Sequence, residues 1–378
     1  MNKSILINAL GVVDSGGVVV LDKTLKECSA EKSNTFFIVC NKNKNTKWLK
    51  TKYKNFNFIF VKGGIFYRIF YENIVFGRLV RSYEIQLIYN FSGSAQLNVF
   101  IKTLQLTKIH NLLFYSRGLD NVYHSKNAHF AWLKQIFLKR MYFKLMLGQS
   151  KYIEVQSKHV KDSLSDFISI EKKIFYIKSD VNVSSKSFAP PKEYNFSKKI
   201  KFLYIVGPHF ESIHKNFVVF VEAMSELDKL NIDYEINITL TKDQLHNSKI
   251  WDAALNSNTN FLGYIDNKGK MNKLFFDNTI LISTSIIETL GLHVIEGIKK
   301  GVITIAPSEN YSRAVYSDQM ILYDTLSSDS LLNEIQTVLK SDMCSELILS
   351  LQDRLKKSET AKYYNILDIF EEVLNVQK

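Results

Sequence analysis

Cysteine, proline and glycine are all scarce in this chain of 378 residues. The three cysteines, Cys28, Cys40 and Cys344, are odd in number and form no Cys-x-x-Cys pair. This argues against a zinc ribbon or a disulfide framework and indicates a reducing compartment. Four prolines and 15 glycines exclude a collagen-like chain and long proline-rich linkers.

Long apolar runs and familiar metal or phosphate motifs are missing too. No run approaches 18 apolar residues, so we expect no transmembrane helix. The first residues fit a buried strand better than a signal peptide, because Asn8 interrupts the apolar stretch. We find no Asp-x-Asp motif, no metal-spaced cluster of His, Cys or carboxylates, no phosphate loop and no nucleophile elbow. No bound metal or cofactor is therefore expected.

The composition is that of a folded protein of two domains, with 46% hydrophobic and 23% charged residues. The net charge of +12 is unevenly divided, since residues 1–190 carry +17 and residues 191–378 carry −5. One explanation is compositional drift in a chain rich in Lys, Asn, Ile and Phe. The other is an anionic partner of the first half, either nucleic acid or a membrane surface with acidic lipids.

Short apolar runs alternate with amphipathic stretches, which predicts α/β layers. A polar, proline-containing stretch at 184–192 indicates a linker. We therefore predict a first domain at 1–185, a second at 199–353, and a helix at 354–378 that returns to the first domain. Strands are expected at 4–10, 35–40, 57–61, 85–89, 112–115, 201–206, 234–240, 279–283 and 302–306, and helices at 17–31, 64–82, 95–104, 129–147, 157–166, 216–230 and 290–300.

The most informative segment follows the apolar run 279–282 and opens a predicted helix. Glu288 and Glu296 lie eight positions apart, with Gly291 and Leu292 between them. A glycine lets an anion approach the backbone, and a helix start offers it free N–H groups and a partial positive charge. Glu288 could accept hydrogen bonds from sugar hydroxyls, and Glu296 from a ribose diol. A capped helix with two ordinary surface glutamates is the alternative.

This segment resembles the Glu-x7-Glu signature of retaining glycosyltransferases of family 4, which have the GT-B fold. The matching residues are Ser285, Glu288, Gly291, Leu292 and Glu296. The resemblance covers most of 200–330 and extends weakly over the whole chain. It implies two Rossmann-like domains facing each other across a cleft, with a C-terminal helix crossing back to the first domain.

The resemblance also assigns roles to residues elsewhere in the second half. Lys215, before a predicted helix, takes the place of the lysine that binds the donor diphosphate. The family's usual second cation is absent, and His209 or His214 could replace it. Tyr264 lies in a segment, 261–265, that is similar to the strand contacting the nucleotide base.

Two features of the first half resemble the family more loosely. The turn Asp14-Ser15-Gly16-Gly17 is similar to the glycine-rich loop where the backbone approaches donor phosphate or acceptor. His110 is similar to a histidine that faces the reacting sugar, where it could hydrogen-bond the sugar or steady positive charge. Each could instead be an ordinary turn or loop residue.

Aromatic and basic residues also interleave at 62–81 and at 134–144. Such helices suit a lipid interface, and similar interleaving can bind nucleic acid. The alternative is an ordinary amphipathic helix, with its aromatic face in the core and its basic face in solvent.

The resemblance therefore implies a retaining, metal-independent glycosyltransferase with Glu288 and His110 as catalytic residues. It would use a nucleotide-diphosphate sugar as co-substrate and act in bacterial surface-polysaccharide or O-antigen biosynthesis. The expected partners are a glycan or lipid-linked acceptor and an anionic membrane surface, with no nucleic acid. The expected location is the cytoplasm, at the inner face of the membrane. A GT-B nucleotide-sugar 2-epimerase and a non-enzymatic nucleic-acid-binding protein remain the alternatives.

Overall fold

The computed structural model describes residues 3–12, 15–125, 127–179, 188–265, 268–358 and 365–376. The chain divides into two compact units. The first comprises residues 1–116, 129–180 and 362–378, and the second comprises residues 117–128 and 181–361. Within the described ranges, every helix is too short or too polar to cross a lipid bilayer.

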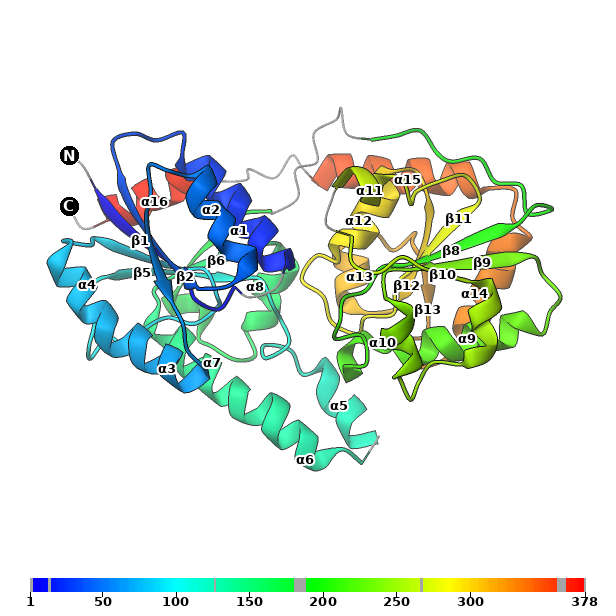
Figure 1. Ribbon diagram of the computed structural model, residues 1–378, viewed down its shortest axis with the longest axis horizontal. Helices are drawn as coiled ribbons and strands as arrows, with labels where there is room; N and C mark the ends of the chain where they lie inside the picture. The colour runs from blue at the N-terminus through cyan, green and yellow to red at the C-terminus, as the bar shows by residue number, and fades with distance from the viewer. Residues whose placement is uncertain are drawn as a thin grey trace. The chain divides into compact units, whose positions relative to one another are not determined.

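The first unit is built on a seven-stranded parallel sheet with the order β3-β2-β1-β4-β5-β6-β7 (Figure 1). Its strands are β1 (Ser4–Ala9), β2 (Thr35–Asn41), β3 (Asn57–Val61), β4 (Leu87–Asn90), β5 (Leu104–Ile109), β6 (Tyr152–Val155) and β7 (Ile174–Ile177). Its helices are α1 (Ser15–Cys28), α2 (Lys44–Lys52), α3 (Ile65–Phe70), α4 (Phe76–Ser82), α6 (His129–Trp132), α7 (Leu138–Gln149), α8 (Lys158–Leu164) and α16 (Ile366–Asn375). π-helical turns at 71–75 and 133–137 join α3 to α4 and α6 to α7.

Both faces of this first sheet are buried, as expected for parallel strands. Alternate residues of β1 point to opposite faces. Ile5 and Ile7 pack in the same cluster as side chains of α1, α2 and α16, whereas Leu6 packs in the cluster that contains Phe76 of α4. Figure 1 shows these two groups of helices on either side of the sheet.

The second unit has a six-stranded parallel sheet with the order β10-β9-β8-β11-β12-β13. Its strands are β8 (Ile200–Tyr204), β9 (Tyr234–Ile238), β10 (Thr259–Phe261), β11 (Thr279–Ile282), β12 (Ile303–Pro307) and β13 (Ile321–Tyr323). Its helices are α5 (Gly118–Ser125), α9 (Phe217–Asp228), α10 (Lys242–His246), α11 (Lys268–Asn272), α12 (Leu292–Lys299), α13 (Asn310–Val315), α14 (Ser328–Leu339) and α15 (Cys344–Ser358). Two parallel α/β sheets confirm the predicted fold class.

The C-terminal region differs from the single helix predicted at 354–378. Two helices occur there: α15 continues to Ser358, and α16 begins at Ile366. The ring of Phe370 in α16 meets Tyr89 of β4 edge-on, with the centroids 5.2 Å apart. The Glu27 carboxylate accepts a hydrogen bond of 3.3 Å from the backbone N–H of Ile366. The last helix is therefore part of the first unit, held by an apolar contact and by a carboxylate at its positive end.

The sequence prediction was wrong between residues 95 and 115. No helix forms at 95–104, and the strand is β5 at Leu104–Ile109 instead of 112–115. The error has a physical cause, because Gln105, Thr107 and Lys108 break up the apolar run and make it resemble a solvated segment. All three are buried in the structure, where polar partners replace water.

A buried ion pair joins two neighbouring strands of the first unit. Lys108 Nζ on β5 lies 2.7 Å from Glu154 Oε1 on β6, and both side chains are fully buried. The Tyr89 hydroxyl donates to the other Glu154 oxygen at 2.6 Å. Because each charge depends on its partner, losing one leaves the other buried without compensation.

We expect Lys108→Met to lower the free energy of unfolding by about 3–5 kcal/mol, because it leaves the Glu154 charge buried without its cationic partner. Urea denaturation at neutral pH measures this. Lys229→Met is the control, since it breaks an exposed 2.7 Å pair with Glu226, and it should cost less than about 1 kcal/mol. Equal losses in the two variants would contradict the role assigned to the buried pair.

Candidate functional site

The second sheet reverses its strand order between β8 and β11. From β8 the chain adds β9 and β10 on one side, and then β11, β12 and β13 on the other side of β8. In open α/β sheets, ligands bind outside the carboxyl ends of the strands at such a switch point. The loop after β8 carries Lys215, and the loop after β11 carries Glu288. The fold therefore brings these two predicted residues together.

Lys215 and Glu288 form a close ion pair at this place. Lys215 Nζ lies 2.7 Å from Glu288 Oε1 and donates a longer bond, 3.3 Å, to the Ser285 hydroxyl. The side chains of the pair remain 27% and 20% exposed. An incoming ligand can therefore reach both charges, which a fully buried pair would not permit.

Backbone contacts hold the two loops against each other. The Thr284 hydroxyl donates to the Lys215 carbonyl at 2.7 Å, and the backbone N–H of Ile286 donates to the His214 carbonyl at 2.8 Å. The Tyr204 hydroxyl lies 2.6 Å from the Thr284 hydroxyl and ties that contact to the end of β8. The position of Lys215 relative to Glu288 is thus fixed by the backbone as well as by charge.

The surroundings keep Glu288 ionised. Burial by itself would raise the pKa of Glu288, but the charge of Lys215 opposes it, followed by His293 and by hydrogen bonds from Lys215 and Ser285. The net result is a pKa below the ordinary value. Glu288 is a carboxylate at neutral pH and accepts hydrogen bonds without carrying a proton to donate.

Two histidines next to the pair are neutral under the same conditions. Burial, reinforced by the charge of Lys215, lowers the pKa of His293 to about 4, although Glu288 acts in the opposite direction. Burial and Lys215 lower the pKa of His214 to about 4 as well. His214 therefore offers a hydrogen bond but no positive charge in this state. His209, the other candidate for a second cation, is exposed in the loop after β8.

Gly291 shapes the start of α12. Its φ of +56° lies in the left-handed region that favours glycine, and a Cβ there would overlap the Tyr316 hydroxyl. That hydroxyl donates to the Gly291 carbonyl at 3.4 Å. Leu292, the first helical residue, is 42% exposed. The first N–H groups of a helix have no partner within it, so α12 presents donors beside Glu288.

Two further predicted donor-binding residues are Tyr264, which precedes Gly291 in the sequence, and Glu296, which follows it. Glu296 is four residues after Leu292 in α12 and so lies on the same helix face, half-buried. Tyr264 is 69% exposed and lies outside the strand, because β10 is at Thr259–Phe261 instead of the predicted 261–265. Gly263, with φ of +63°, turns the chain out of the sheet there.

The first-unit candidates lie after strands of the other sheet. His110 directly follows β5, and its ring centroid is 5.9 Å from that of Phe91. The sequence interpretation placed the strand after His110, which is wrong, because the strand precedes it. Gly16 and Gly17 lie in the first turn of α1, after β1. Asp14, named with them, lies outside the described residues.

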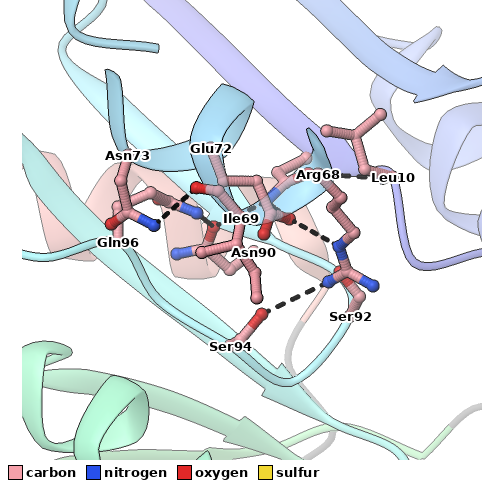
Figure 2. Close-up of polar contacts among 10 residues, drawn as sticks. Leu10, Arg68, Ile69, Glu72, Asn73, Asn90, Ser92, Ser94 and Gln96 are labelled. Atoms are coloured by element: carbon pink, nitrogen blue, oxygen red, sulfur yellow. Dashed lines mark hydrogen bonds and ion pairs between the residues drawn. The ribbon is translucent and has the colours of Figure 1, made fainter. Parts of the chain in front are cut away.

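Some residues of interest were not selected from the sequence. Tyr316 has no motif, and only its contact with Gly291 shows its role. Arg68 was counted among the basic residues of an aromatic stretch, yet Figure 2 shows its side chain directed into a polar cluster. Among the described residues, no three His, Cys, Asp or Glu side chains gather as metal ligands would.

The comparisons with known proteins bear directly on this site. Residues 190–361 match the family described as "Glycosyl transferases group 1", a region that includes Lys215, Glu288 and α12 and is slightly less than half of the chain. No curated protein matches the sequence.

Solved structures match over the whole chain. A glycosyltransferase from Rickettsia africae ESF-5 is 15% identical, with a TM-score of 0.64 and 99% of each chain covered. Anabaena Alr3699/HepE, crystallised with UDP and glucose, is 11% identical, with a TM-score of 0.65 and full coverage of both chains. The lipopolysaccharide outer core galactosyltransferase WaaB in its apo form is 16% identical, with a TM-score of 0.58 and coverage of 98% of this chain and 99% of that one.

These structures confirm the GT-B fold. The match of residues 190–361 indicates a glycosyltransferase group 1 domain in the second half of the chain, and with it glycosyltransferase activity.

We expect Gly291→Ala to destabilise the second unit, because the new methyl group overlaps the Tyr316 hydroxyl and a non-glycine residue must hold a positive φ. The backbone strain costs about 1–2 kcal/mol, and the overlap adds about 1–3 kcal/mol. Thermal unfolding measures the sum. Tyr316→Phe removes only the hydroxyl, so the double variant should recover part of the loss. No recovery would show that the contact with Tyr316 is unimportant.

Proposed function

We propose that this glycosyltransferase is a retaining, metal-independent enzyme. It would move a sugar from a nucleotide-diphosphate donor to a lipid-linked glycan in bacterial surface-polysaccharide biosynthesis, of the family 4 and O-antigen type. The observation that carries the proposal is the accessible Lys215–Glu288 pair beside the start of α12, at the switch point of the second sheet.

The donor fits the charges of this site. The diphosphate would bind the Lys215 ammonium and the first N–H groups of α12, which together supply positive charge without a metal ion. Glu296 would accept hydrogen bonds from the ribose diol, and Tyr264 would lie along the base. Support comes from Alr3699/HepE, a similar fold that was crystallised with UDP and glucose.

The reaction needs stabilisation of the leaving group more than a side-chain nucleophile. Lys215 and the α12 N–H groups would stabilise the charge that develops on the departing diphosphate. The acceptor hydroxyl would attack on the face that the diphosphate leaves and give its proton to a diphosphate oxygen. Glu288, held as a carboxylate, would orient the sugar through its hydroxyls, and His110 stays the second proposed catalytic residue.

Support for a membrane-bound acceptor comes from the surface of the first unit. Large apolar side chains are exposed on α3 and the π-helical turn after it, and again on α6 to α7, among exposed lysines and arginines. The apolar members are Phe66, Tyr67, Phe70, Ile74, Phe130, Leu133, Phe137, Leu138, Met141 and Leu145. The basic members are Arg78, Arg81, Lys134, Lys139 and Lys144. Apolar groups that enter the headgroup region beside cations suit an anionic leaflet, here the inner face of the cytoplasmic membrane.

The catalytic proposal is tested with Lys215→Ala and a panel of nucleotide sugars. Loss of the lysine removes a charged hydrogen-bond partner and leaves Glu288 to repel phosphate, so donor affinity should fall roughly 10- to 100-fold. The matched control is Lys242→Ala, an exposed lysine on α10 of the same unit, which should not change donor affinity. Calorimetric titration of the donor measures both.

Product analysis with a lipid-linked acceptor completes that test. We expect the transferred sugar to keep the anomeric configuration that it had in the donor. An inverted product would contradict the retaining mechanism. A donor epimer formed without acceptor would favour the 2-epimerase, and unchanged affinity in Lys215→Ala would contradict the donor site.

The membrane proposal is tested by cosedimentation with vesicles. Phe66→Ser combined with Phe130→Ser removes two side chains that are 85% and 78% exposed, so folding should be unaffected. Binding to vesicles with acidic lipids should weaken by roughly tenfold or more, since each phenyl ring contributes apolar area. Leu349→Ser, at a 48% exposed position of the second unit, is the control. Equal binding of the unaltered protein, the double variant and Leu349→Ser to acidic vesicles would contradict the proposal. It would also be contradicted if the unaltered protein bound neutral vesicles as strongly as acidic ones.

A further inference from the structure

The first sheet also has a switch point, between β1 and β4, where its strand order reverses. Ligands favour this crevice in each such sheet. The turn after β1 contains Gly11, and the turn after β4 contains Ser92 and Ser94. Arg68 of α3 reaches these turns (Figure 2). A cationic side chain therefore lies at the place in the first unit that corresponds to Lys215 in the second.

Three contacts orient the Arg68 guanidinium. Its Nε donates to Glu72 Oε1 at 3.1 Å, and its Nη2 donates to the hydroxyls of Ser92 and Ser94 at 3.1 and 3.3 Å. The Arg68 side chain is 25% exposed, whereas that of Glu72 is 3% exposed. The carboxylate is thus on the buried side of the pair, and the guanidinium is on the accessible side.

A buried polar network fixes Glu72 in turn. Asn8 Nδ2, at the end of β1, donates to Glu72 Oε1 at 2.9 Å and makes a longer contact with Asn90 Oδ1. Gln96 Nε2 donates to the same Asn90 oxygen at 2.7 Å. Asn8, Asn90 and Gln96 are all fully buried. This buried network fixes Glu72, and Glu72 in turn orients Arg68, so the guanidinium is preorganised for a ligand.

The remaining nitrogen of Arg68 faces the turn after β1. A Cβ at Gly11 would come within 2.6 Å of Nη1 and would also overlap Ser92. The absence of a side chain at this position therefore makes room for the guanidinium. Among the described residues, none accepts a hydrogen bond from Nη1. Its two N–H groups remain available at the carboxyl edge of the sheet.

A second polar side chain lies close to the same pair. Burial raises the pKa of Tyr142 on α7 to about 12, with Glu72 acting in the same direction and Arg68 opposing it. Both charges are thus within electrostatic reach of the Tyr142 hydroxyl, which keeps its proton at neutral pH. That hydroxyl is a further hydrogen-bond donor near Arg68.

We propose that Arg68, held in place by Ser92 and Ser94, binds an oxyanion of the acceptor at the β1–β4 switch point of the first unit. This inference rests on the proposed function, because it names the chemistry of the second substrate. A guanidinium presents paired N–H groups that match a phosphate or a carboxylate, and Glu72 orients it without covering Nη1. The two sources of such a group are the diphosphate of a lipid-linked acceptor and the carboxylate of an acidic sugar.

The kinetic test compares Arg68→Lys with Arg354→Lys in the full-length protein. Arg354 is exposed on α15 of the second unit, outside the network and outside the proposed membrane surface, so it is the control. Arg68→Lys keeps the charge and loses the paired N–H groups. We expect the KM for a lipid-diphosphate acceptor to rise at least tenfold, with the KM for the donor unchanged. Arg354→Lys should alter neither KM.

A binding test separates this site from the donor site. In a Lys215→Ala background, inorganic pyrophosphate and glucuronate are titrated into proteins with Arg, Lys or Met at position 68. Binding of pyrophosphate that is lost in Arg68→Met points to the lipid diphosphate, and the same result with glucuronate points to an acidic sugar. Ser94→Ala, which removes only one hydroxyl, should weaken binding by a smaller factor and covers the case in which Arg68→Met does not fold.

The proposal is overturned if Arg68→Lys folds normally and leaves the acceptor KM unchanged. It is overturned equally if neither anion binds more weakly in the Arg68 and Ser94 variants than in their parent. A rise in the donor KM alone would assign Arg68 to the other substrate. Failure of the proposed function would show in a different measurement. In that case the single variant Lys215→Ala would bind the donor as tightly as the unaltered protein does.

Discussion

The ion pair between Lys215 and Glu288 is the interaction on which the account of function depends. Its 2.7 Å contact joins the loops after β8 and β11, and the charge of Lys215 offsets the burial of Glu288 and keeps that carboxyl group ionised. Because the pair is only partly buried, the proposed exchange of the carboxylate partner of Lys215 for a phosphate would not cross a large desolvation barrier. Glu288 would then be free, still ionised, to face the hydroxyls of a sugar.

The two units share a sheet topology and the placement of one cationic side chain. Each is a parallel sheet whose order reverses once, and each places a cation held by a glutamate at that reversal, Lys215 in one and Arg68 in the other. A flexible ammonium suits a leaving group whose charge changes during the reaction. A planar guanidinium fixed by a carboxylate and two hydroxyls suits a group that is only held. The difference in support, backbone contacts against a side-chain network, agrees with these two proposed roles.

The sequence was sufficient for the architecture and for most of the second unit, because its signals are local. Buried parallel strands are continuous apolar runs, and Gly291 precedes a helix with an apolar face. The first unit was harder, since β5 carries buried polar residues whose partners, such as Asn90 and Glu154, are distant in sequence. For the same reason Arg68 could not be distinguished from a surface arginine. Its role depends on Ser92, Ser94 and Glu72 meeting in space.

A crystal structure of the full chain with the nucleoside diphosphate that stabilises it most is the most direct test of the central claim. The account predicts that the diphosphate lies at the β8–β11 switch point, with an oxygen within hydrogen-bond distance of Lys215 Nζ and another facing the first N–H groups of α12. A diphosphate bound elsewhere, with Lys215 still paired to Glu288 as it is here at 2.7 Å, would contradict it.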